Sequence, residues 1–392
     1  MAATDLLRVE RLRERMRESN VDVLVCRLPE NVLYLTDYWP HHGVSVALLP
    51  RDGTTLLFVP EIEGEYADPT WATVVPFGWG LLKDGDLYDS YRRLLAQAGA
   101  RLGLQGARVG VEQSFEIVGA TYRSAEPVVP AGPWSALLTQ VFADAHLVDA
   151  TSLLQETRAV KTAYELEKLR IANEIAEMGM AAFLERLEPG MTEAQVGALI
   201  EHKIRADGPG YKNARLVRAS AEVSTGPVGS TKATLLIPST TRVVGEGDIV
   251  LVELATGVDG YWSDLTYVAV AGAPTARQRA VYNAVLQAQQ AAARCLKPGA
   301  AWSEPDRAAR TVLEEAGLGD YFVHITGHGV GFRYHESMPM LMPGAVARLE
   351  VGMVSSVEPG VYIPGFGGVR IEDNVAVGAD GPIFLSTPRT PW

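Results

Sequence analysis

The sequence predicts a protein of two parts, an α/β domain over residues 1–155 followed by an α+β domain over residues 156–392. Three observations support this fold class. Short apolar runs alternate with helical patterns over the first 150 residues, the pattern changes near residue 152 to long amphipathic stretches, and the second part repeats one order of elements twice. A chain of 392 residues also exceeds the usual size of a single domain.

The first domain is expected to begin with a charged helix over residues 5–18. Five apolar runs then indicate β-strands: VDVLVC, VSVALLP, TTLLFVP, TVVPF and RVGVE. A second helix is expected over residues 85–98. His41 and His42 follow Trp39-Pro40 in a predicted loop, where adjacent histidines are usually solvated. No catalytic constellation stands out in this domain.

The second domain contains two halves of matching design. Each half has a long amphipathic helix, a Leu-x-Pro-Gly segment, a shorter helix and then strands; the long helices are TRAVKTAYELEKLRIANEIAEMGMAAFLERL and TARQRAVYNAVLQAQQAAARCL. Thr192 with Gln195, and Thr275 with Gln278, stand in capping-box positions, and Ser303 is expected to cap the fourth helix. The repeat predicts two similar α+β units about a pseudo-twofold axis, with a ligand site between them.

A hairpin in the first half brings two acidic residues together. If Asp259-Gly260 forms the turn, Asp264 pairs with Ala255. Glu253 then lies diagonally opposite Asp264 on the same face, with Cβ atoms roughly 5–8 Å apart. Two carboxylates in this arrangement repel each other unless one is protonated or a cation bridges them. We favour a cation-bridged pair over one solvated acid and one acid with a local hydrogen bond.

The second half supplies further polar groups at equivalent places. Glu358 ends one apolar strand and Glu372 follows another, on either side of a Gly-rich turn. Between the two acidic hairpins, HITGHGVGFRYHE holds His324, His328 and His335, three of the seven histidines of the chain. Glycines flank His328 and permit close approach of the backbone to a site. Four carboxylates and one imidazole suit Mn²⁺, Co²⁺, Fe²⁺ or Zn²⁺ in a paired site.

Composition excludes several classes of protein. The net charge of −12 argues against nonspecific nucleic-acid binding. Two cysteines, Cys26 and Cys295, exclude a disulfide framework. We see no signal peptide and no apolar run of membrane-spanning length, so we expect a cytoplasmic protein with no membrane partner.

Together these motifs resemble the pita-bread metallopeptidases, in particular the branch of Xaa-Pro dipeptidase (prolidase) and aminopeptidase P. RLPENVLYLTDY is similar to the N-terminal domain of that branch, and LEPGMTE, GHGVGFRYHE, VEPGVYI and VRIEDN match its catalytic domain in order and spacing. The resemblance covers nearly the whole chain. It implies a creatinase/prolidase-type N-terminal domain, a pita-bread catalytic domain with pseudo-twofold halves, a homodimer, and two divalent metal ions per chain, Mn²⁺ first, with Co²⁺, Zn²⁺ or Fe²⁺ as alternatives.

The resemblance also implies a role for each site residue. A metal-bridged hydroxide would attack the scissile carbonyl of a Xaa-Pro dipeptide. Glu358 would shuttle the proton, His335 would help to stabilise the oxyanion, and His335 would also line the substrate site. Arg370 and His324 would hold the carboxylate on the proline side. The five implied metal ligands are Glu253, Asp264, His328, Glu358 and Glu372.

Two positions depart from the family pattern. The first metal ligand is usually aspartate, and here it is Glu253; Leu236 stands where the family usually has a substrate-site histidine. These departures leave alternatives to a dipeptidase open: an aminopeptidase P acting on longer Xaa-Pro peptides, a creatinase-like hydrolase of a non-peptide substrate, or a catalytically silent binding protein.

Overall fold

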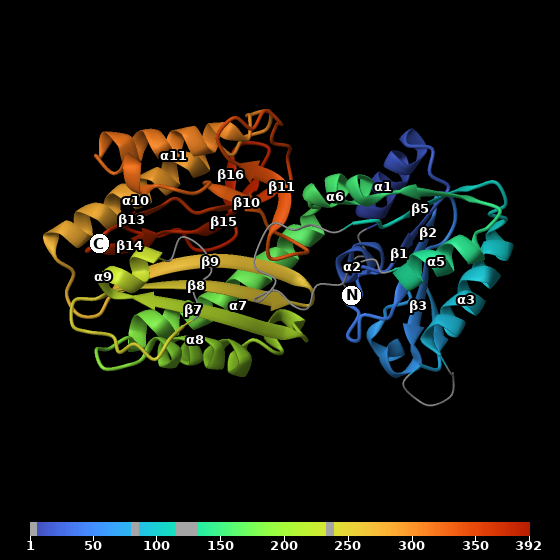
Figure 1. Cartoon of the computed structure of the whole chain (residues 1–392), viewed down its shortest axis with the longest axis horizontal. Coiled ribbons are helices and arrows are strands. Elements are labelled where there is room, and N and C mark those ends of the chain that lie inside the picture. The colour runs from blue at the N-terminus through green and yellow to red at the C-terminus, as the bar shows by residue number, and fades with distance from the viewer. Residues whose placement is uncertain (1–5, 80–85, 115–131, 233–238) are drawn as a thin grey trace. The chain divides into compact units, whose positions relative to one another are not determined.

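The computed structural model describes residues 6–79, 86–114, 132–232 and 239–392, which divide into two compact units (Figure 1). The N-terminal unit contains the described residues up to 158, and the C-terminal unit contains those from 159 onward. Within the described residues, none of the helices combines the length and the apolar character that crossing a membrane requires.

A six-stranded mixed sheet forms the centre of the N-terminal unit, in the order β4-β3-β2-β1-β5-β6. Its strands are β1 (Val23–Cys26), β2 (Val46–Pro50), β3 (Leu56–Pro60), β4 (Thr73–Phe77), β5 (Arg108–Val111) and β6 (His146–Asp149). Its helices are α1 (Leu7–Glu18), α2 (Pro29–Thr36), η1 (Glu61–Tyr66), α3 (Leu87–Leu102), α5 (Gly132–Val141) and α6 (Thr151–Ala159). The five predicted strands and both predicted helices are confirmed.

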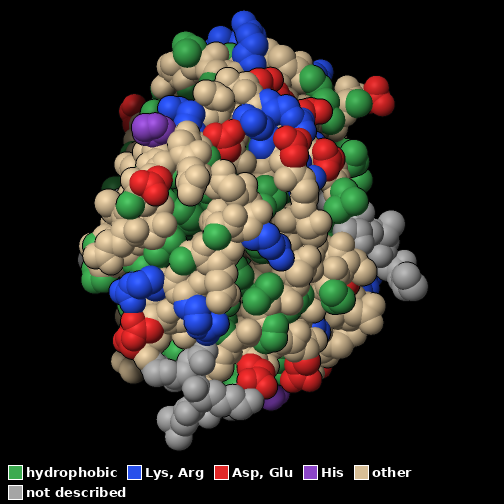
Figure 2. All heavy atoms as spheres, turned by 90° about the vertical axis from the view of Figure 1, so that its right-hand side faces the viewer, with side chains coloured by type: hydrophobic (Ala, Val, Ile, Leu, Met, Phe, Trp, Pro, Cys, Tyr) green, Lys and Arg blue, Asp and Glu red, His purple; other side chains and the backbone are tan. Residues whose placement is uncertain are grey.

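The surface of the N-terminal unit carries charges of both signs. Acidic and basic side chains are interspersed on the face that Figure 2 shows. Exposed pairs such as Arg17 with Asp52 contribute at most about 1 kcal/mol each. Each large side chain buried in the apolar core of this unit, such as Tyr91, Leu95 and Trp134, contributes more, about 1.5–3 kcal/mol.

The first half of the C-terminal unit packs two helices on a three-stranded antiparallel sheet. The helices are α7 (Ala163–Arg186) and α8 (Glu193–Asp207), and the strands are β7 (Val217–Thr225), β8 (Ile249–Val258) and β9 (Tyr261–Val270). Short helical turns lie at η2 (Tyr211–Asn213), α9 (Gly226–Gly229) and η3 (Ser230–Lys232). Thr192 and Gln195 form the predicted capping box of α8.

The first long helix starts later than the sequence predicts. We expected one helix from residue 157, but α6 ends at Ala159 and α7 begins at Ala163, after a new capping box of Thr162 and Glu165. Two backbone contacts cause the break. Val160 forms an isolated β-bridge with Met353, and the N–H of Lys161 donates to the carbonyl of Gly352.

The second half repeats the plan with α10 (Ala276–Arg294) and α11 (Ser303–Glu315), followed by η4 (Gly319–Tyr321). Its five-stranded sheet has the order β11-β10-β12-β15-β16, and β13 pairs with β14 in a separate hairpin. The strands are β10 (Gly327–Gly329), β11 (Glu336–Leu341), β12 (Val354–Val357), β13 (Gly360–Ile363), β14 (Gly367–Arg370), β15 (Asp373–Val377) and β16 (Pro382–Phe384). The capping box of Thr275 and Gln278 is confirmed, but Ser303 is the first residue of α11 and makes no cap; Trp302 precedes it.

The C-terminal unit has two apolar cores, and the sheet of β7, β8 and β9 lies between these cores. In Figure 1 this sheet lies between α7 and α8 on one side and the strands of the second half on the other. Val252 and Leu254 pack in the core with α7 and α8, whereas Ile249 and Leu251 pack in the core with α10 and α11. Odd-numbered residues of β8 therefore face the second half, because side chains alternate along a strand.

Candidate metal centre

The hairpin of β8 and β9 has the predicted register. Its turn residues, Asp259 and Gly260, have φ angles of 51° and 90°, which are the positive values that a two-residue hairpin turn requires. Asp264 pairs with Ala255, and Glu253 pairs with Thr266. Glu253 and Asp264 therefore lie on one face, and this face is turned toward the second half of the unit.

Hydrogen bonds join the two halves of the C-terminal unit beside Asp264. The side-chain amide of Asn374 on β15 donates to the backbone carbonyl of Asp264 at 2.8 Å and accepts from its N–H at 2.9 Å. The N–H of Glu372 donates to the carbonyl of Thr266 at 3.2 Å. These bonds attach the end of the β14–β15 segment to β9, so that Glu372 stands next to Asp264.

Glycines around His328 allow the backbone to pack closely. A Cβ atom at Gly327 would lie 2.0 Å from the carbonyl oxygen of Ser356, and one at Gly329 would lie 2.1 Å from that of Met338. Both positions exclude any side chain. His328 is thereby held against β12, where its N–H donates to the hydroxyl of Ser356 at 3.1 Å.

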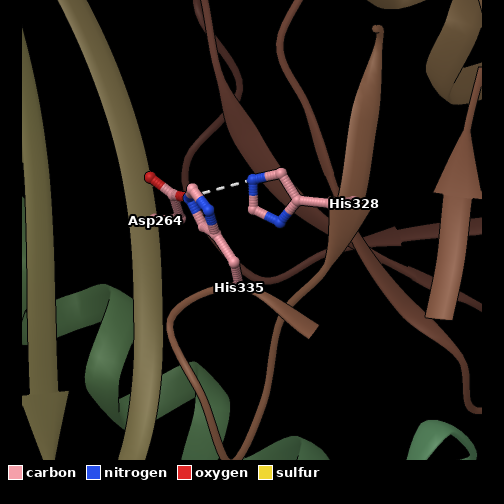
Figure 3. A group of neighbouring side chains, drawn as sticks. All are labelled: Asp264, His328 and His335. Atoms are coloured by element: carbon pink, nitrogen blue, oxygen red, sulfur yellow. Dashed lines mark ion pairs between the residues drawn. The ribbon is translucent and has the colours of Figure 1, made fainter. Parts of the chain in front are cut away.

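Donor groups from five residues meet between the two halves. The Nε2 atom of His328 lies 3.4 Å from Oδ2 of Asp264 and 3.2 Å from Oε1 of Glu358. His335 places its Nε2 atom 3.2 Å from the same oxygen of Asp264, and Figure 3 shows Asp264 facing both rings. Among the described residues, two groups of donor atoms are close enough to share a cation: Asp264, His328 and His335, and His328, Glu358 and Glu372.

The acids of the cluster perturb one another's ionisation. Burial by itself lowers the pKa of His328, but the hydrogen bond to Glu358 and the charges of Glu358 and Asp264 outweigh it and raise that pKa to about 9. Burial and the neighbouring charges of Asp264 and Glu358 raise the pKa of Glu372 well above its usual value. The site therefore concentrates negative charge that a cation would neutralise.

Two atoms have the geometry that a metal ion requires. The Nδ1 atom of His328 lies 3.0 Å from the carbonyl oxygen of Gly329, so Nδ1 keeps its proton, and a metal ion would replace the Nε2 proton that faces the acids. Oε1 of Glu372 is buried, and the described residues offer it no hydrogen-bond partner. A divalent ion would satisfy both atoms, and hard carboxylate oxygens with one imidazole suit such an ion. The residues present therefore fit the metal.

Glu253 belongs to neither group of donors. Its Oε2 atom forms an ion pair with Nη2 of Arg370, and its Oε1 atom accepts a hydrogen bond of 2.7 Å from the hydroxyl of Tyr334. Arg370 is buried, and it also donates from Nε to Thr266 at 3.0 Å and from Nη1 to Tyr362 at 2.7 Å. All three guanidinium nitrogens of Arg370 thus have protein acceptors.

The remaining predicted residues lie at the edge of this cluster or outside the described chain. His324 is half-buried, and its Nε2 atom lies 3.0 Å from the hydroxyl of Tyr362. His335 stacks on Tyr334, with ring centroids 4.3 Å apart. Leu236, at which we noted the missing histidine, lies outside the described residues.

Sequence reasoning missed the residues that hold the ligands. Thr266 donates to Oε2 of Glu372 at 2.7 Å, and Ser356 donates to Oε1 of Glu358 at 3.1 Å. One signal was available for both. Each hydroxyl stands two residues from a predicted acid, Thr266 after Asp264 within β9 and Ser356 before Glu358 at the end of β12, and residues two apart in an extended chain share a face.

Comparisons with known proteins agree with this architecture. Residues 167–379 match metallopeptidase family M24, and residues 8–160 match the creatinase/prolidase N-terminal domain. A Xaa-Pro dipeptidase from Pyrococcus furiosus is 31% identical over 375 residues, which cover 95% of this chain and 96% of the relative. The solved structure of a Xaa-Pro dipeptidase from Bacillus anthracis is 26% identical, has a TM-score of 0.79 and covers 99% of each chain.

A prolidase structure from Pyrococcus horikoshii is also similar, with 26% identity, a TM-score of 0.76, and coverage of 98% of this chain and 99% of that one. The fold is thus a creatinase-type N-terminal domain followed by a pita-bread domain, as the sequence predicts. The family and the donor groups together imply divalent metal ions at the cluster. The chain belongs to metallopeptidase family M24 and is an enzyme of that family.

Proposed function

We propose that this chain hydrolyses Xaa-Pro dipeptides in the cytoplasm, as a homodimer and with Mn²⁺ as its preferred metal. The observation that carries the proposal is the convergence of donors from both halves of the C-terminal unit, Asp264 from one and His328, Glu358 and Glu372 from the other. Relatives that match over nearly the full chain are named Xaa-Pro dipeptidases, which supports the substrate class.

Asp264, His328, Glu358 and Glu372 would hold the metal ion. A bound divalent ion polarises a carbonyl oxygen and lowers the pKa of water, which together supply a nucleophile at neutral pH. The resemblance implies two such ions, and the second depends on Glu253. Mn²⁺ is our first choice over Co²⁺, Zn²⁺ and Fe²⁺ because three of these four donors are carboxylates, which suit Mn²⁺.

Glu358 is the residue best placed to hold and move a proton. Its Oε1 atom contacts His328 and accepts from Ser356, and the Oε2 atom lies 3.9 Å from Nε of Arg370. Burial raises the pKa of Glu358, but the hydrogen bond from His328 reverses this, and the net pKa is lowered. Glu358 therefore begins as a carboxylate that can accept a proton.

His335 and His324 would contact the substrate. His335 is partly exposed at 18% and lies beside Asp264, where its ring can donate to the oxygen of the scissile carbonyl. His324 is the more accessible partner of Tyr362, and we assign it to the carboxylate of the proline residue. Arg370 would act on that carboxylate through Tyr362, to which its Nη1 atom donates.

The test is hydrolysis of Ala-Pro and Met-Pro against the tripeptide Ala-Pro-Ala, after chelation and addition of Mn²⁺. We expect the dipeptides to be cleaved and the tripeptide to be cleaved at least tenfold more slowly. The matched control is Asp264→Asn, which keeps the shape of the side chain, removes its charge, and should abolish turnover. Equal or faster cleavage of the tripeptide would indicate an aminopeptidase P. No turnover of any Xaa-Pro peptide with any of the four metals would refute the proposal.

A further inference from the structure

Glu253 is the residue whose surroundings the family pattern does not explain. It occupies the position of a metal ligand, yet neither group of converging donors includes it. Its backbone position is correct, since Glu253 pairs with Thr266 and shares a face with Asp264. The side chain, rather than the register of the strand, therefore removes Glu253 from the cluster.

Two partners hold the carboxylate of Glu253 away from the other acids. Arg370 forms an ion pair with its Oε2 atom, and Tyr334 donates to its Oε1 atom at 2.7 Å. Both oxygens are thus used, and the carboxylate is only 14% exposed. An ion pair shielded from water in this way is costly to break, because separation leaves a buried charge without compensation.

Arg370 is also fixed from its other side. Its Nε atom donates to Thr266 and its Nη1 atom to Tyr362, so the guanidinium cannot follow Glu253 if the carboxylate moves. Thr266 in turn donates to Glu372, which connects the Arg370 network to the metal cluster without using Glu253 as a ligand. Binding a second ion through Glu253 would require the loss of two interactions, and the other carboxylate near Arg370, that of Glu358 at 3.9 Å, is itself a proposed ligand of the first ion.

From these contacts we propose that the chain binds one divalent ion tightly, at Asp264, His328, Glu358 and Glu372, and that Glu253 serves as the counter-ion of Arg370. A second ion binds at least a hundredfold more weakly than the first. Aspartate at residue 253 would be shorter by one methylene, roughly 1.5 Å, and its carboxylate would stay near the strand, out of reach of Arg370 and Tyr334. Glutamate reaches both partners.

The inference rests on the proposed metal centre, and its test counts ions rather than turnover. Metal-free protein is titrated with Mn²⁺ by calorimetry, and the bound Mn²⁺ is examined by electron paramagnetic resonance. We expect one tight ion per chain and the hyperfine pattern of isolated Mn²⁺. Two ions with dissociation constants within tenfold of each other, or the spectrum of a spin-coupled Mn²⁺ pair, would overturn the inference.

Two variants separate the roles of Glu253. Glu253→Gln keeps the shape of the side chain, and the dissociation constant of the tight ion should stay within threefold of that of wild type. A loss of affinity of more than tenfold would mean that Glu253 is a ligand and would overturn the inference. Glu253→Asp frees the carboxylate from Arg370 and should tighten the second ion at least tenfold. If the second ion stays as weak as in wild type, the assignment to Glu253 is wrong.

The ion count and the catalytic assay fail separately. One tight ion without hydrolysis of any Xaa-Pro peptide would refute the proposed function and leave the metal inference standing. Two tight ions with rapid dipeptide hydrolysis would refute the metal inference alone. Circular dichroism melting of both variants shows whether a change in ion binding reflects loss of the fold.

Discussion

The ion pair of Lys161 and Glu336 allows the stability of the catalytic unit to be tested quantitatively. The two side chains are buried, with exposures of 0% and 3%, and Nζ of Lys161 contacts Oε2 of Glu336. The other oxygen of Glu336 accepts from the N–H of Phe332 at 3.0 Å, which anchors the loop that carries His335. Glu336 thus links the segment before α7 to the histidine loop.

Glu336→Gln should lower the free energy of unfolding of this unit by about 3–5 kcal/mol, because it leaves a buried ammonium group unpaired. Glutamine can still accept from Phe332, so the loss measures the charge and not the anchor. Lys161→Met should lower the free energy of unfolding by a similar amount, because it leaves the buried carboxylate of Glu336 without its ammonium partner. The double variant removes both charges and should cost less than the sum of the single changes by about 2 kcal/mol or more.

Urea unfolding followed by tryptophan fluorescence measures these free energies, and hydrogen exchange of the peptide spanning residues 327–341 locates the loss. The control is Asp207→Asn, which breaks the exposed pair with Lys203 on α8 and should cost less than about 1 kcal/mol. Single-variant losses that add within about 0.5 kcal/mol in the double variant would refute the reasoning.

Three further results are expected. Burial raises the pKa of Glu112 to about 7, so the folded state prefers the protonated acid. Relative to Glu112→Gln, wild type should therefore lose about 3 kcal/mol of unfolding free energy, measured by urea titration, as pH rises from about 4.5 to 7. A pH-independent difference between the two proteins would contradict this. Gly329→Ala should weaken Mn²⁺ binding at least about tenfold in calorimetry because the new Cβ displaces β10, whereas Gly64→Ala, with open space around it, should not. Tyr362→Phe should raise KM for Ala-Pro about tenfold at unchanged kcat, and a fall in kcat alone would exclude a binding role.

Local turn chemistry made much of the first half of the site predictable. Asp259-Gly260 specifies a two-residue hairpin, and once that turn is set, the period of two along each strand places Glu253 and Asp264 on one face. The capping boxes at Thr192 and Thr275 were predictable for the same reason, because their partners lie three residues away. Contacts over such short separations depend little on the rest of the fold.

Elements that depend on distant partners were not predictable in this way. The break before α7 exists because Val160 and Lys161 pair with a strand-like segment almost two hundred residues later. Helix α2 was missed because seven of its eight residues are buried, so no polar face marks its period. The carboxylate of Glu112 binds the N–H groups of Arg27 and Leu28 just before that helix, and this cap also comes from far along the chain.

The behaviour of Glu253 combines both kinds of dependence. Its strand position follows from the nearby turn, but the direction of its carboxylate follows from Arg370, which a different hairpin supplies. The sequence shows that Arg370 stands two residues before Glu372 and suggests that it faces the same cluster. The sequence does not show whether the guanidinium of Arg370 contacts a substrate or an acid of the protein. That outcome depends on the length of the side chain at residue 253, which is one methylene longer in glutamate than in aspartate. The added methylene of Glu253, relative to aspartate, therefore couples two residues: the contact that holds Glu253 away from the metal donors also occupies Nη2 of Arg370.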